Sequence, residues 1–121
     1  MPDEKVFQRL ETILKKISFI ENIVREYGSV HHALADEQMG RASILMHLTS
    51  ISEQFDKLLH SGEFDALSFF EKEDIKGSND LRNFIAHDYE GVDLYIVEAV
   101  LNERLPIIKK SAEKALHTLK K

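Results

Sequence analysis

The sequence predicts a single all-α domain over residues 1–121, an up-and-down bundle of four main helices with one short additional helix. Apolar residues recur at alternating spacings of three and four along the long segments, and no stretch shows the alternation of a strand. The five Gly and two Pro residues are too few for the many turns of a β-sandwich or barrel. The length suits one domain that buries its core without disulfides or metal.

The first helix is expected over roughly residues 3–27 and the second over roughly 30–60. Gly28 suits the end of the first helix, and Ser29 is a suitable N-cap for the second. Gly40, inside the second segment, costs about 1 kcal/mol relative to Ala in an ordinary helix, so it indicates close helix contact or a kink. The apolar stripe of the first helix consists of Val6, Leu10, Ile13, Ile17, Ile20, Val24 and Tyr27.

The pattern weakens after the break at residues 61–62, where we expect a short helix or turn that buries phenylalanines. Residues 77–80 read as a loop before a helix over residues 81–87. Asp93 is the expected N-cap of a last long helix, which Pro106 should kink because proline donates no backbone hydrogen bond.

Composition excludes several classes of protein. The chain has no Cys, which excludes a disulfide scaffold, a thiolate nucleophile and cysteine-based metal sites. It has neither a signal-peptide pattern nor an apolar run near 18 residues, so we expect a cytoplasmic protein without a membrane span. The common nucleotide-binding and hydrolase motifs are absent, and His31, His32, His47, His60 and His117 lack the spacing of a ligand pair. We therefore expect no metal and no cofactor.

The charge distribution is uneven. The net charge is −5, and residues 61–104 hold 4 Lys or Arg against 11 Asp or Glu, whereas residues 105–121 hold 5 Lys against one Glu. Contact with RNA would therefore depend on a local positive site rather than on the overall field.

One polar segment differs from ordinary bundle surface. Arg82, Asn83, His87 and Tyr89 gather at the end of the predicted helix 81–87 and in the loop after it. Asn83 and His87 are four residues apart and share a helical face, and the long Arg82 side chain can converge on the same anion. A guanidinium that holds phosphate beside an imidazole that moves protons suits phosphodiester chemistry. The spacing fits equally well a structural role.

In that structural alternative, Arg82 pairs with Asp80 or Glu90 and His87 only caps the helix end.

The string Arg82-x4-His87-x-Tyr89 resembles the R-x4-H-x-Y signature of HEPN-domain toxins of the HepT type. The Gly-Val-Asp-Leu string at residues 91–94 and the Leu-Pro at residues 105–106 resemble later parts of the same family. The similarity spans most of residues 1–119 and is weakest over 60–80.

Two positions on the second helix also resemble polar positions of the family, Arg41 and Glu53. The chain departs from the family in the longer separation between Gly77 and Arg82. The resemblance implies an all-α, HEPN-like bundle.

The resemblance also implies a metal-independent endoribonuclease, the toxin of a type VII-like toxin–antitoxin pair, which acts on tRNA or mRNA as a homodimer. Arg82 is expected to hold the phosphate, His87 to act as general base and Asn83 to orient a phosphate oxygen, with Glu53 and Arg41 as supporting residues. A rim for the RNA backbone is expected from Lys109, Lys110 and Lys114.

A partner follows from the same resemblance: a minimal nucleotidyltransferase antitoxin that silences the toxin by adding AMP to Tyr89. Two alternatives stay open. The chain could be a non-catalytic helical binding partner of a nucleotidyltransferase, or a plain dimerisation module that uses the apolar seam of residues 6–27.

Overall fold

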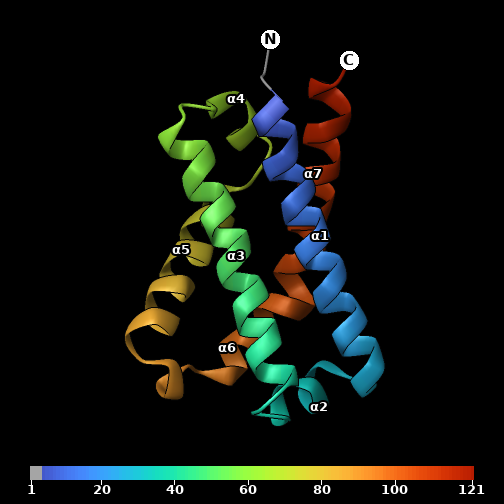
Figure 1. Cartoon of the computed structure of the whole chain (residues 1–121), viewed down its shortest axis with the longest axis vertical. Helices are drawn as coiled ribbons and strands as arrows, with labels where there is room; N and C mark the ends of the chain where they lie inside the picture. Colours follow the sequence, from blue (N-terminus) through green and yellow to red (C-terminus); the bar gives the residue numbers. More distant parts are fainter. Residues whose placement is uncertain (1–3) are drawn as a thin grey trace.

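The computed structural model describes residues 4–121 and confirms an all-α bundle (Figure 1). The predicted start of the first helix at residue 3 lies outside the described residues. The elements are α1 (Glu4–Tyr27), α2 (Val30–Ala35), α3 (Gly40–His60), α4 (Phe64–Leu67), α5 (Lys72–His87), the 3₁₀ turn η1 (Tyr89–Gly91), α6 (Leu94–Ala99), the π-helical turn η2 (Val100–Arg104) and α7 (Leu105–Leu119).

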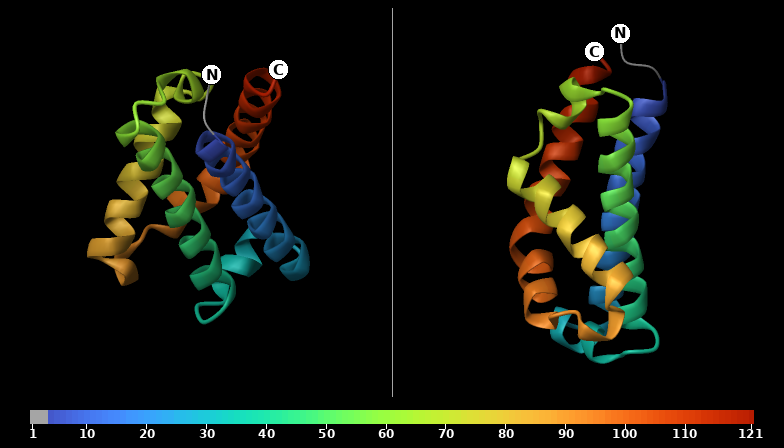
Figure 2. Two further views of the ribbon diagram at one scale, coloured as in Figure 1. Left: turned by 45° about the horizontal axis from the view of Figure 1, so that its top comes forward. Right: turned by 90° about the vertical axis from the view of Figure 1, so that its left-hand side faces the viewer.

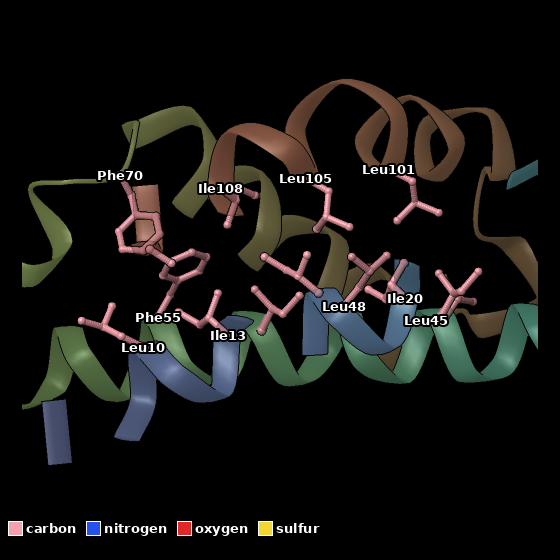
Figure 3. Packing of buried hydrophobic residues seen from close by; sticks show 14 of the residues in the cluster. Leu10, Ile13, Ile20, Leu45, Leu48, Phe55, Phe70, Leu101, Leu105 and Ile108 are labelled. Atoms are coloured by element: carbon pink, nitrogen blue, oxygen red, sulfur yellow. The ribbon is translucent and has the colours of Figure 1, made fainter. Parts of the chain in front are cut away.

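Helix α1 lies between α3 and α7, and α5 packs on the other side of α3 (Figures 1 and 2). The core forms where α1 and α3 face α7 and the segment around α4 (Figure 3). The rings of Phe55 and Phe70 meet edge to face with centroids 4.9 Å apart, which closes the core near α4. The predicted burial of phenylalanine in this segment is correct for Phe70, whereas Phe64 is exposed.

The apolar stripe of α1 lies inside the molecule. Its five innermost side chains are at most 2% exposed: Val6, Leu10, Ile13, Ile17 and Ile20. The idea that the seam of residues 6–27 serves as a dimerisation surface is therefore wrong, because α3 and α7 already cover it.

The second predicted segment, 30–60, is two helices rather than one. Ser29 caps α2 as predicted, since its Oγ accepts a hydrogen bond from the backbone N–H of His32 at 3.0 Å. Asp36 then adopts an extended conformation and ends α2. The Tyr27 hydroxyl donates to the Asp36 carboxylate, and this bond is the main reason that the pKa of Tyr27 is raised and that of Asp36 lowered. A side-chain interaction with α1 thus fixes the turn that separates α2 from α3.

Gly40 lies at a close contact between helices, one of the two possibilities that a glycine inside a helical segment indicates. A Cβ on Gly40 would lie 2.3 Å from the carbonyl oxygen of Ala33 and 3.1 Å from the Tyr27 ring. The first turn of α3 can therefore approach α2 and the end of α1 only because this residue has no side chain.

We expect Gly40→Ala to lower the free energy of unfolding by about 1–3 kcal/mol, since backbone must move to admit the methyl group. Gly77→Ala is the matched control: Gly77 also lies in a helix, but a Cβ there meets nothing within 4 Å. That control should be stabilising by about 0.5–1 kcal/mol. Urea unfolding of both variants measures the difference, and equal effects would contradict close packing at Gly40.

The predicted loop at residues 77–80 is helical, which corrects the sequence reading. Helix α5 runs without interruption from Lys72 to His87. Two bonds along its surface support this stretch: Lys76 Nζ pairs with Asp80 Oδ2 at 2.7 Å, and Arg82 Nη2 donates to Asn79 Oδ1 at 2.6 Å. Because side chains of α5 also pack on the core, the contacts outweigh the turn-forming preferences of these residues.

The last helix begins as predicted and changes form before Pro106. The Oδ1 atom of Asp93 caps α6 by accepting from the backbone N–H groups of Tyr95 and Ile96. The π-helical turn η2 follows and closes with a bond from the Leu105 N–H to the Val100 carbonyl. Pro106 then lies in the first turn of α7, where its missing N–H needs no partner. The wider turn is how the chain accommodates the proline.

A charged network joins η2 to the start of α5. Arg104 contacts both carboxylate oxygens of Asp74, with Nε to Oδ1 at 2.7 Å and Nη2 to Oδ2 at 2.9 Å, and Nη2 also contacts Glu71 Oε2 at 2.6 Å. Asp74 is 5% exposed. The two carboxylates raise the pKa of Arg104 above its ordinary value, so this guanidinium stays charged.

Candidate active site

Arg82 lies on α5, on the side that faces α3. Its Nη1 donates to Asp56 Oδ2 of α3, and its Nη2 donates to Asn79 Oδ1 one turn earlier on α5. The Arg82 side chain is 23% exposed and the Asp56 side chain 32% exposed. The guanidinium is therefore held at the surface in a fixed direction. Two of its five N–H groups are engaged, which leaves three to contact an anion.

Asn83 and His87 lie on the last two turns of α5, and both are exposed. As predicted from their spacing of four, they are neighbours on one helix face. His87 is the last residue of α5. The structural alternative is wrong about the partner of Arg82, because the guanidinium forms its ion pair with Asp56 and not with Asp80 or Glu90.

Tyr89 lies in the turn that follows α5. The Asp88 backbone N–H donates to the Phe84 carbonyl and ends the helix, and the Asp88 Oδ1 accepts from the Gly91 N–H at 3.1 Å. A Cβ on Gly91 would lie 2.1 Å from the Asp88 carboxylate, so a larger residue there would displace this side chain from its bond to the backbone N–H of residue 91. The turn leaves the Tyr89 side chain 36% exposed, two residues beyond His87.

The two supporting residues lie apart from each other on α3. Glu53 is exposed and lies one turn before Asp56, on the stretch of α3 that pairs with Arg82. Arg41 lies about 22 Å of helix rise from Asp56, and its Nε donates to the Leu34 carbonyl at 2.8 Å. Its observed contact closes the turn between α2 and α3.

The predicted lysine rim is partly engaged within the chain. Lys109 Nζ pairs with Glu21 of α1 at 3.1 Å, whereas Lys110 and Lys114 are exposed on α7. The charge of Lys109 is therefore already balanced by a carboxylate.

Sequence reasoning missed both partners of Arg82. Asn79 was assigned to a loop, although its position three residues before Arg82 would place it on the same helix face. Asp56 is 26 residues from Arg82, and no local pattern indicates that pairing. The pairing of Asp56 with Arg82 follows only from the packing of α3 against α5.

Within residues 4–121, no group of three or more His, Asp or Glu side chains is placed to hold a metal ion. Two of the other histidines instead lie within hydrogen-bond distance of groups in their own helix or its cap. His32 Nδ1 lies 2.8 Å from Ser29 Oγ, and His60 Nδ1 lies 2.8 Å from the Asp56 carbonyl oxygen. In the same described part of the chain, no helix combines the length and apolarity that a membrane span requires.

His47 of α3 is the histidine whose titration should affect stability. Its ring packs against Phe19 of α1 with centroids 5.3 Å apart, and its buried Nδ1 atom has no hydrogen-bond partner among residues 4–121. Burial, with a smaller contribution from nearby Lys16, lowers the pKa of His47 below the ordinary 6.5.

Because the folded-state pKa is the lower one, His47 supports the fold fully above pH 6.5, and this support is lost as the pH falls through the folded pKa. We expect the wild type to lose more stability than His47→Gln between pH 7.5 and pH 5. Urea unfolding at the two pH values measures the difference, with the exposed His117→Gln as control. Parallel losses in wild type and His47→Gln would contradict the assignment.

Fold and site together define a class of protein: an all-α bundle that has an Arg-x4-His-x-Tyr string at the end of one helix. The sequence model described as ribonuclease HepT-like matches residues 13–115. The chain therefore belongs to the HepT-like ribonuclease family. No curated protein and no solved structure matches the chain.

Proposed function

We propose that this protein is a metal-independent endoribonuclease, the toxin of a type VII-like toxin–antitoxin pair. The observation that carries the proposal is the pairing of an anchored Arg82 with an exposed His87 on the same end of α5, in a chain of the HepT-like ribonuclease family. Arg82 supplies a fixed positive group for a phosphate, and His87 supplies an imidazole that can accept a proton.

The proposed reaction needs only groups of the chain and of the RNA. His87 takes the proton of a ribose 2′-hydroxyl, whose oxygen attacks the adjacent phosphorus. The bond from phosphorus to the 5′ oxygen breaks, and a 2′,3′-cyclic phosphate remains. The 5′ oxygen takes a proton from a water molecule, and the hydroxide left behind takes the proton that His87 holds. Arg82 stabilises the charge that develops on the phosphate oxygens, and Asn83 donates a hydrogen bond to one of them.

The proposed assembly is a homodimer in which two copies of the motif face one cleft. The apolar seam of α1 is buried, so the contact has to use another face of the bundle. Sedimentation of the purified protein over a range of concentrations tests this point.

We propose that a cognate nucleotidyltransferase silences the enzyme at Tyr89. The phenol oxygen would attack the α-phosphorus of ATP, lose its proton and release pyrophosphate. The exposure of Tyr89 and its place two residues after His87 support the assignment, because an added phosphate would repel RNA beside the general base. Mass spectrometry after incubation with the transferase and ATP should show AMP on wild type and none on Tyr89→Phe.

The experiment that tests the activity is cleavage of tRNA and mRNA by unmodified protein in EDTA. We expect fragments that end in a 2′,3′-cyclic phosphate and carry a 5′-hydroxyl. Cleavage only after addition of a divalent cation would overturn the metal-independent mechanism.

The acidic surplus of residues 61–104 favours a second candidate, a non-catalytic partner of the nucleotidyltransferase. No cleavage by protein with an intact, unmodified Tyr89, together with complex formation that survives Arg82→Ala and His87→Ala, would select it.

A further inference from the structure

An apolar groove runs between α5 on one side and α6, η2 and α7 on the other, with α3 as its floor. The right-hand view of Figure 2 shows α5 lying obliquely between α3 and the α6–α7 segment. The groove encloses about 340 Å³, which lies within the range of about 300–1,000 Å³ typical of ligand pockets. Its apolar lining includes Leu48, Leu81, Phe84, Ile96, Leu105 and Ile108.

Large apolar side chains at the mouth of the groove are exposed to solvent. Phe84 of α5 is 48% exposed and Ile96 of α6 is 56% exposed, and both line the groove. Tyr95, next to Ile96, is 86% exposed. An exposed apolar surface that continues into a groove is typical of an interaction site.

The rim of this groove is acidic. Glu73, Asp80 and Asp93 line it. Of these, Asp80 is paired with Lys76, and the lining cation Arg104 is paired with Asp74. Three of the four cations in residues 61–104 form ion pairs within the chain, namely Lys76, Arg82 and Arg104. Because residues 61–104 hold 11 acids against these four cations, an excess of negative charge remains around the groove after the ion pairs have formed.

We propose that this groove binds a basic amphipathic helix of another protein, with apolar side chains in the groove and Lys or Arg side chains against the acidic rim. A groove between two helices suits a helix that inserts side chains at spacings of three and four. Because the rim is acidic, charge complementarity requires that the residues beside the apolar face of the bound helix be positively charged. The inference goes beyond the proposed ribonuclease activity and does not depend on it.

The same charge argues against two other occupants. A symmetric contact with a second copy of this chain would bring the same acidic rim of each copy together, and like charges in an interface are unfavourable. An RNA strand would place phosphates against the same carboxylates. A basic amphipathic segment can pack apolar side chains on the lining of the groove and place positive charges against its acidic rim.

The test uses synthetic amphipathic helices of about 18 residues as probes. One probe has Leu on one face and Lys on the other, and the second has the same Leu face with Glu in place of Lys. Fluorescence anisotropy should show binding of the Leu/Lys probe, weakened by salt, and no binding of the Leu/Glu probe. Ile96→Ser should weaken binding at least about tenfold, and so should the pair Glu73→Gln with Asp80→Asn.

The matched controls remove similar groups elsewhere. Met46→Ser removes an exposed apolar side chain of α3, and Glu11→Gln removes an exposed acid of α1. Both should bind the Leu/Lys probe as the wild type does. Phe84→Ser provides a second groove variant should Ile96→Ser disturb folding.

Three results would overturn the proposal. One is equal affinity of groove variants and controls, and another is the absence of Leu/Lys binding to folded wild type. The third is a wild-type dimer that Ile96→Ser dissociates, which would assign the groove to a second copy of the chain.

Discussion

His87→Ala should lower the rate of RNA cleavage by about 10²–10⁴-fold, the range in which general bases contribute. His87 is exposed at the last residue of α5, so its removal takes away a proton acceptor without opening a buried cavity. The rate constant for a saturating RNA, measured in EDTA for wild type and variant, gives the effect.

His117→Ala is the matched control, because His117 is also an exposed histidine and lies near the end of α7. It should cleave RNA as the wild type does. The midpoint of thermal unfolding should be unchanged in both variants. Full activity of His87→Ala would remove His87 from the mechanism, and loss of the fold would make it a structural residue.

Asp74→Ala should lower the free energy of unfolding by about 1–3 kcal/mol, because Arg104 loses the buried carboxylate that accepts two of its hydrogen bonds. The pair that it forms with Arg104 joins the first turn of α5 to the π-helical turn before α7. Loss of the carboxylate also leaves a space where the side chain packed. Chemical unfolding followed by circular dichroism measures the change.

Two further variants separate the ion pair from simple loss of charge. Glu73→Ala removes the neighbouring exposed acid and should cost less than about 1 kcal/mol. The double variant Asp74→Leu with Arg104→Met replaces the pair by apolar groups and should recover most of the stability lost in Asp74→Ala. A single substitution at Asp74 that costs no more than Glu73→Ala would show that the network does not hold α5 against η2.

The parts of the fold that can be predicted from the sequence are those that depend on local patterns. Ser29 and Asp93 were recognisable as N-caps because a cap depends on residues only two or three positions away. The ends of α1 and α5 were predicted for the same reason. The split between α2 and α3 was not, since it depends on the bond from Tyr27, the last residue of α1, to Asp36, which lies nine residues later in the turn after α2.

The candidate site shows the same division. Its residue types and spacing, Arg82, Asn83, His87 and Tyr89, are a property of one continuous segment, and they carry the family resemblance that the match over residues 13–115 confirms. The direction of the Arg82 guanidinium is a property of two segments, because Asp56 reaches it from α3.

The sequence by itself determined the helical class, the caps and the polar segment, because each depends on periodicity or on neighbours within one turn. Only the tertiary structure decided that residues 77–80 are helical, that Arg82 is paired with Asp56, and that Asp74 and Arg104 join α5 to η2. The physical reason is distance along the chain. These ion pairs join residues 26 and 30 positions apart, and their energies exist only after the helices have packed.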